Sequence, residues 1–140
     1  MYVDTNIVID ICDGNREGYN ASLKIITALL EDESVEDIYI NSDTLSNLFY
    51  ILRSRSKIEQ DIVLEKMRYI TTIFTMINTE MEEVNNTLAL CEDETQSFVD
   101  YEDTLQYVCA KKINADLILT NDKGFVSLDI EVSGTKDFKL

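Results

Sequence analysis

Short apolar segments alternate with longer stretches of helical periodicity, and this alternation constrains the fold more than any other feature of the chain. Apolar runs at residues 2–3, 38–40 and 115–119 predict buried strands, and a weaker strand is expected around Ile130. Strands that alternate with amphipathic helices build βαβ units, whose parallel sheet is covered by helices on both faces. We therefore expect an α/β fold, a three-layer α/β/α sandwich around a central, mainly parallel sheet of four to five strands.

Several segments have the spacing of helices that bury one face. Residues 43–55 give the clearest pattern, because apolar side chains recur there at i, i+3, i+4 and i+7. Thr79 and Glu82 have capping-box spacing, which predicts a helix start with a buried face of Met81, Val84, Leu88 and Cys91. The other helices are predicted from Thr5 onward, over residues 18–31, over Val63 to Phe74, and from Asp100 with Leu105, Val108 and Cys109 buried.

The length and composition suit one domain. With 140 residues and 45% apolar content, the chain can bury a single core, so one domain over residues 1–140 is expected. Early acids contradict a signal peptide, and no apolar run reaches membrane-spanning length. The three cysteines are widely separated and form no C-x-x-C pair. These features predict a cytoplasmic protein with reduced thiols and no membrane contact.

The absence of histidine excludes several kinds of catalysis. Without this residue, the chain cannot form a Ser-His-Asp triad, a Cys-His pair or a zincin motif. Any catalysis must therefore depend on carboxylates.

The formal charge of −15 is unevenly distributed. Residues 1–40 hold nine acids and two bases, and residues 71–110 hold nine acids and no base. The nearly neutral remainder carries cations that could contact a phosphate backbone. The weak candidates for such contact are Arg53, Arg55, Lys57, Lys111 and Lys123.

Three acids far apart in the sequence fall where strands end or helices begin: Asp4, Asp103 and Asp122. In a parallel α/β fold, such positions meet at the carboxyl edge of the sheet, where ligands bind. Carboxylates that are held close repel one another, and Mg²⁺ or Mn²⁺ relieves this repulsion. Each acid alone also has a structural explanation as a helix cap or turn residue, but their combined order favours a metal site.

The segments that carry these acids resemble the PIN-domain family, which includes bacterial VapC-type toxins. They read V-D-T-N, D-Y-E-D-T-L-Q-Y-V-C-A and L-I-L-T-N-D-K-G-F, and the similarity covers nearly the whole chain. Asp4 matches the family's acid after the first strand, and Asp103 matches the acid seven residues before a small residue, here Ala110. Thr120 and Asp122 match its T-x-D-x-x-F turn. The resemblance implies that these three acids are catalytic and hold the metal.

The resemblance also suggests supporting residues and one departure. Thr5 and Asn6 are similar to positions whose hydroxyl and amide groups support the first acid. The family usually has Glu on the helix after the second strand, where this chain has Asn47. An amide can ligate a metal or bind its water but cannot supply charge or act as a base. The acids that could partly substitute for the missing Glu are Asp43, Asp100 and Glu102.

By resemblance, the chain is expected to be a metal-dependent endoribonuclease that leaves 5′-phosphate and 3′-hydroxyl ends. The family further implies a toxin restrained by an antitoxin with a basic segment, and a homodimer is plausible.

Two alternatives stay open. Because of Asn47, the chain could be a catalytically weakened PIN fold that binds RNA or protein. An Asp after an apolar strand also fits an aspartyl-phosphate phosphatase, although Asn6 stands where that class has a second Asp.

Overall fold

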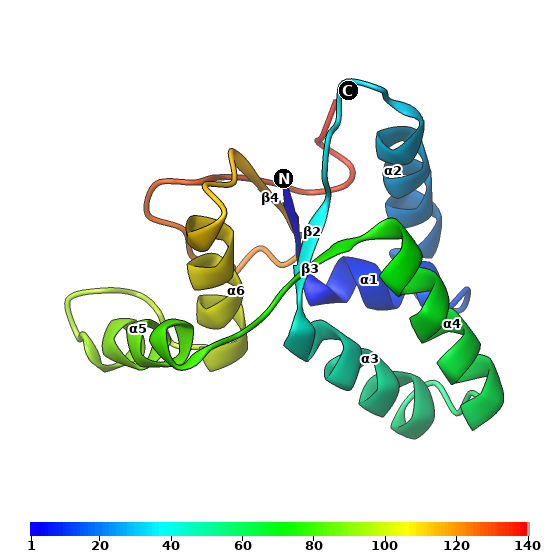
Figure 1. Cartoon of the computed structure of the whole chain (residues 1–140), viewed down its shortest axis with the longest axis horizontal. Coiled ribbons are helices and arrows are strands. Elements are labelled where there is room, and N and C mark those ends of the chain that lie inside the picture. Colours follow the sequence, from blue (N-terminus) through cyan, green and yellow to red (C-terminus); the bar gives the residue numbers. More distant parts are fainter. Residues whose placement is uncertain (140) are drawn as a thin grey trace.

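The computed structural model describes residues 1–139, which fold into a five-stranded sheet flanked by helices (Figure 1). The strands are β1 (Tyr2–Val3), β2 (Tyr39–Asn41), β3 (Thr75–Ile77), β4 (Leu117–Leu119) and β5 (Glu131–Ser133). The helices are α1 (Thr5–Cys12), α2 (Tyr19–Glu31), α3 (Ser42–Ser54), α4 (Gln60–Ile73), α5 (Met81–Glu92) and α6 (Tyr101–Lys112). Within residues 1–139, no helix is long and apolar enough to span a bilayer.

All neighbouring strands are parallel and lie in the order β3-β2-β1-β4-β5. From β1 the chain builds the sheet outward through β2 and β3, and then returns to place β4 on the other side of β1. The order of strands therefore reverses between β1 and β4. In open α/β sheets, ligands bind beyond the carboxyl ends of the strands at this kind of switch point.

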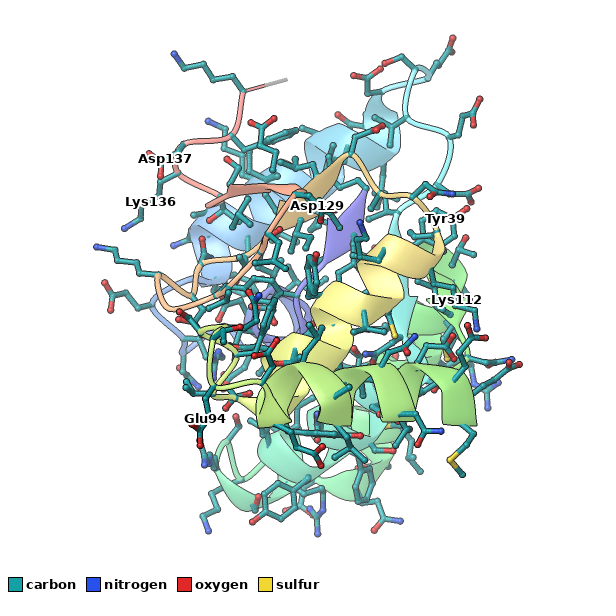
Figure 2. All side chains as sticks on the ribbon, turned by 90° about the vertical axis from the view of Figure 1, so that its left-hand side faces the viewer. Tyr39, Glu94, Lys112, Asp129, Lys136 and Asp137 are labelled. Carbon is teal, nitrogen blue, oxygen red and sulfur yellow. The ribbon has the colours of Figure 1, made fainter. Side chains whose placement is uncertain are left out.

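Helices cover both faces of the sheet. The cartoon places α1 to α4 on one side and α5 and α6 on the other (Figure 1), and Figure 2 shows α5 crossing over α6 on the second side. Adjacent residues of β1 face different cores, because Val3 packs with the α1–α4 side and Tyr2 with the α6 side. Leu119 and Ile118 divide in the same way on β4. The expected three-layer α/β/α fold is confirmed.

Helix caps lie at the carboxyl ends of two of the strands. Asp4 caps α1 by accepting from the backbone N–H of Asn6 at 3.3 Å, and Asn41 caps α3 by accepting from that of Thr44 at 3.0 Å. Asp100 caps α6, as expected, through the N–H of Asp103 at 3.0 Å. The carboxyl edge of the sheet therefore collects polar side chains for structural reasons before any chemistry is considered.

The structure corrects two sequence predictions. The sequence pattern missed β3, because its apolar residues continue the apolar spacing of α4 with no turn between them. The capping box of α5 is formed by Glu80 and Glu83, one residue later than predicted.

The face predicted for α5 is only partly buried: Met81 is 71% exposed and Leu88 is exposed as well, whereas Val84 and Cys91 are partly buried. Glu83 is buried instead, since its carboxylate accepts from the backbone N–H of Glu80 at 2.9 Å and pairs with Lys112 of α6 at 3.1 Å. Because of this ion pair, a polar side of α5 faces α6. The apolar spacing of the helix had predicted that a different side would be buried.

Candidate active site

Asp4 lies at the switch point and is fully buried, with 0% of its surface exposed. One carboxylate oxygen, Oδ1, accepts from the amide nitrogen of Gln106 at 2.9 Å, and the other, Oδ2, accepts from the hydroxyl of Thr120 at 2.5 Å. Burial raises the pKa of Asp4, these hydrogen bonds lower it in part, and the charge of Asp122 raises it further. No lysine or arginine among residues 1–139 forms an ion pair with this carboxylate.

Gln106 was not predicted from the sequence, yet it joins α6 to the beginning of α1. Its carbonyl oxygen accepts from the backbone N–H of Thr5 at 2.9 Å, so its amide nitrogen is directed at Asp4. The hydroxyl of Thr5 was expected to support Asp4, but it contacts Gln106 and the hydroxyl of Thr44 instead. Asn6 supports Asp4 through its backbone N–H. The available signal for Gln106 was its position three residues after Asp103, on the same helix face.

The turn after β4 brings Thr120 and Asp122 to the same edge. The Thr120 hydroxyl donates to Asp4 and accepts from the backbone N–H of Asp122 at 3.0 Å. The Asp122 carboxylate accepts from the N–H of Gly124 at 2.7 Å. One hydroxyl therefore fixes the relation between the ends of two neighbouring strands and places two acids beside each other.

Asp103, in the first turn of α6, lies close enough to Asp122 for the two carboxyl groups to hydrogen-bond. Burial is the first cause that raises the pKa of Asp103 to about 7, followed by the charges of Asp4 and Asp100 and then by this contact with Asp122. The charges of Asp4 and Asp122, which lie far from Asp103 in the sequence, therefore both raise its pKa at this edge of the sheet.

Glu102 and Asn47 meet across the gap between α6 and α3. The amide nitrogen of Asn47 donates to Oε1 of Glu102 at 2.7 Å. Loss of solvent raises the pKa of Glu102, and the charge of Asp4 raises it further. The two side chains line a cavity of about 320 Å³ together with Asp43 and Tyr101. The position where the family usually has Glu therefore holds an amide bonded to a carboxylate from another helix.

The arrangement fits a divalent cation in its donor chemistry, although the side chains are not gathered as ligands around one point. Within residues 1–139, no three acidic or cysteine side chains form a cluster that could hold a metal ion. Asp4 uses both oxygens for Gln106 and Thr120, whereas Asp103 and Asp122 contact each other. A set of carboxylate oxygens whose charges raise one another's pKa suits a hard cation such as Mg²⁺ or Mn²⁺.

The predicted cations are mostly far from these acids. Arg53, in the last turn of α3, donates to the carbonyl of Ile58 at 2.8 Å, and Arg55 and Lys57 lie in the turn that follows this helix. Lys111 is ion-paired with Asp129. Of the five candidates, only Lys123 follows directly after a site acid.

Linked carboxylates at the switch point of a parallel α/β sheet define a carboxylate-based site in this domain. The profile of the PIN domain family matches residues 1–131. The chain is also 38% identical over 138 residues to Ribonuclease VapC1 of Aquifex aeolicus (strain VF5), covering 99% of this chain and 92% of that protein. The chain belongs to the PIN domain family.

Two solved structures share the fold at low sequence identity. The Sarcin-Ricin loop cleaving toxin VapC20 of Mycobacterium tuberculosis is 8% identical and has a TM-score of 0.67, over 84% of this chain and 85% of that one. VapBC2 from Rickettsia felis, bound to a DNA fragment from its promoter, is 16% identical with a TM-score of 0.63, over 95% and 96%.

Proposed function

We propose that this protein is an endoribonuclease that hydrolyses RNA phosphodiester bonds and acts as the toxin of a toxin-antitoxin pair. The observation that carries the proposal is the buried Asp4 carboxylate, which has hydrogen-bond donors around it but no basic partner among residues 1–139. A buried, unpaired carboxylate is costly unless positive charge compensates it. The name of the Aquifex relative, a ribonuclease, supports RNA as the substrate.

Asp4, Asp103 and Asp122 would hold the compensating Mg²⁺ or Mn²⁺ and are the proposed catalytic acids. When bound, such a cation supplies the positive charge that draws the scissile phosphate into the site and favours ionisation of the attacking water. Glu102 adds a fourth acid, and Asn47 orients it at 2.7 Å. This pair compensates for the absence of an acid at position 47.

The remaining side chains orient these acids. Gln106 and Thr120 hold the two oxygens of Asp4 in place, and the cap at Asp100 fixes the start of α6 and with it Asp103. In the metal-free site the pKa of Asp103 is raised to about 7, and a bound cation would favour the ionised form of this carboxyl group, which can ligate the metal. In-line attack of water on the phosphorus would leave 5′-phosphate and 3′-hydroxyl ends.

An antitoxin with a basic segment is the proposed protein partner. The net charge of −15 favours such a partner and accelerates its association. The solved VapBC2 structure, in which a related fold occurs in a VapBC assembly, agrees with this proposal. A homodimer is a further proposal, for which the family resemblance is the only support.

The proposal is tested by cleavage of a structured RNA with and without Mn²⁺. Wild-type protein should cleave only with the metal, and Asp4→Asn and Asp103→Asn should reduce the rate by at least about a hundredfold. Asp116→Asn, which removes one exposed acid before β4, is the matched control and should cleave as wild type does. Equal rates in all four proteins would exclude this mechanism.

The second candidate is an RNA- or protein-binding module of weakened activity, and Asn47 is the observation that favours it. Thermal melting with millimolar Mn²⁺ separates the two candidates, because a metal that binds the native state raises its melting temperature. Absence of a shift, together with retained RNA binding, would favour the module.

A further inference from the structure

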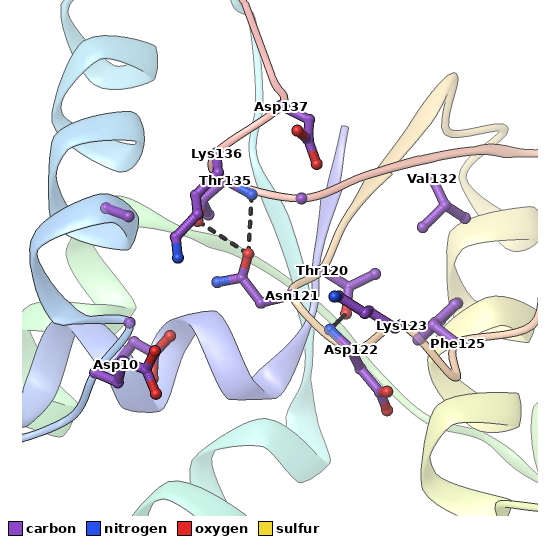
Figure 3. Close-up of a pocket in the computed structure, with 14 residues that line it drawn as sticks. Asp10, Thr120, Asn121, Asp122, Lys123, Phe125, Val132, Thr135, Lys136 and Asp137 are labelled. Atoms are coloured by element: carbon purple, nitrogen blue, oxygen red, sulfur yellow. Dashed lines mark hydrogen bonds between the residues drawn. The ribbon is translucent and has the colours of Figure 1, made fainter.

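An opening of about 470 Å³ lies directly beside the candidate active site (Figure 3). It shares Thr120 and Asp122 with that site and continues away from it, between the start of α2 and the segment that follows β5. Its size falls in the range of pockets that hold small molecules. Of the acids described above for the candidate active site, only Asp122 lines this opening.

The floor of the opening is built by hydrogen bonds between distant segments. The Oδ1 atom of Asn121 accepts from both the backbone N–H and the hydroxyl of Thr135, each at 2.9 Å, and its amide nitrogen donates to Ser22 of α2 at 3.4 Å. Thr120 adds a backbone bond to Ser133 at 2.9 Å. The opening is therefore formed before any ligand arrives, which lowers the entropic cost of binding.

One acid in the wall of the opening, Asp10, already has a cationic partner within the protein. Asp10 is buried, and its carboxylate accepts from Nε of Arg16 at 2.6 Å and from the hydroxyl of Ser22 at 3.1 Å. Gly18 packs so closely that an added Cβ would lie 2.0 Å from Oδ2 of Asp10. Asp10 therefore shapes the wall and is not available to a ligand.

The accessible charges of the opening are mixed. Lys123 and Lys136 come from different segments, and neither forms an ion pair with any residue between 1 and 139. Figure 3 shows their side chains on either side of Asn121. Glu17 and Asp137 are exposed acids of the same opening, and Val132 gives it an apolar side. A free anion would meet two acids here, whereas a nucleotide offers a phosphate for the lysines and base N–H groups for the carboxylates.

We propose that this opening binds the RNA nucleotide adjacent to the scissile phosphate. Its own phosphate pairs with Lys123 and Lys136, and its base lies against Val132 with its polar edge toward Glu17 or Asp137. The proposal rests on the ribonuclease function proposed above. It assigns Lys136, which lies 14 residues beyond Asp122 in the sequence, to substrate binding.

Binding of fluorescein-labelled oligouridine and oligoadenosine tests the proposal, with anisotropy measured in an Asp103→Asn background so that the RNA stays intact. Lys123→Ala and Lys136→Ala should each weaken binding by about fivefold to tenfold. The double variant should lower the slope of log Kd against log salt by about 0.7, as loss of one single-strand phosphate contact requires, and each single variant should lower it by less than that. Arg68→Ala, which removes one exposed charge on α4 outside the opening, is the control and should change the Kd by less than about twofold.

A variant that fills the opening tests its role in RNA binding without changing the charge of the protein. Ala21 lines the opening from α2, and Ala21→Phe would fill it without changing charge. This variant should weaken RNA binding while the salt slope stays unchanged. Equal weakening by Arg68→Ala and the two lysine variants would overturn the proposal, as would wild-type affinity in Ala21→Phe.

Measurements of kcat and KM distinguish an error in the proposed nucleotide subsite from an error in the proposed ribonuclease function. If the otherwise wild-type protein cleaves RNA and the KM is unchanged in Lys123→Ala, Lys136→Ala and Ala21→Phe, only the subsite is wrong. If it neither binds nor cleaves RNA, the proposed function fails and the subsite fails with it. A higher KM with an unchanged kcat in the three variants supports the subsite.

Discussion

Replacement of Gln106 by Leu should destabilise the protein, although the two side chains have similar volumes. Gln106 is 1% exposed and makes two hydrogen bonds of 2.9 Å, one from the backbone N–H of Thr5 and one to the carboxylate of Asp4. Loss of a bond to a charged group costs about 1.5–3 kcal/mol, and a buried N–H left without a partner costs about 1–3 kcal/mol. Burial of Leu returns about 1 kcal/mol, so we expect a net loss of about 3 kcal/mol.

Urea unfolding with EDTA measures this loss directly. A change of about 3 kcal/mol corresponds to a drop in melting temperature of about 10 °C for a chain of this size. Gln60→Leu places the same substitution at the exposed start of α4 and should shift stability by less than about 0.5 kcal/mol. A loss in Gln106→Leu no larger than that of Gln60→Leu would refute the argument that Gln106 holds Asp4 and Thr5 together.

Three further predictions concern neighbouring features. Because the pKa of Asp103 rises from 3.8 to about 7 on folding, the folded state binds the extra proton, so metal-free protein should lose stability as the pH rises from about 4 to about 7 and then level off. Urea unfolding should show this slope, and Asp103→Asn should reduce it; an unchanged slope would contradict the cause. Gly18→Ala should destabilise by about 1–3 kcal/mol, because its Cβ would lie 2.0 Å from Asp10; a melting temperature equal to wild type would refute the contact. Asn47→Ala should lower kcat by about tenfold through Glu102, Asn47→Gln should restore less than half of it, and wild-type kcat in both would exclude a positioning role.

The sequence predicted the layers and most elements because local periodicity determines them. Alternating apolar segments identified four of the strands, and Asp100 identified the start of α6. The position of β3 could not be found, because three residues of mixed exposure directly follow a helix of similar apolar content.

The candidate site was only partly predictable for a different reason. Asp4 and Asp122 are visible because they follow strands, and strand ends are local features. Gln106 was missed because its role depends on how α6 packs beside β1, at a separation of 102 residues from Asp4. Glu102 was named as a possible substitute for the missing Glu, but its hydrogen bond with Asn47, 55 residues away, was not predicted. No local pattern encodes a partner at such a distance.

The hydrogen bonds around Asp4 have a common direction. The N–H of Thr5 donates to Gln106, the amide of Gln106 donates to Asp4, and the hydroxyl of Thr120 and the backbone N–H of Asn6 donate to Asp4 as well. The last three of these hydrogen bonds end at the Asp4 carboxylate, which only accepts. Replacing Asp4 by Asn would then do more than delete a charge. The new amide nitrogen would face the donors of Gln106 and Asn6 at the Oδ1 position, or would require the Thr120 hydroxyl to accept at the Oδ2 position. The isosteric variant is therefore expected to rearrange this shell, and Asp4→Ala is needed beside it to separate lost charge from reversed polarity.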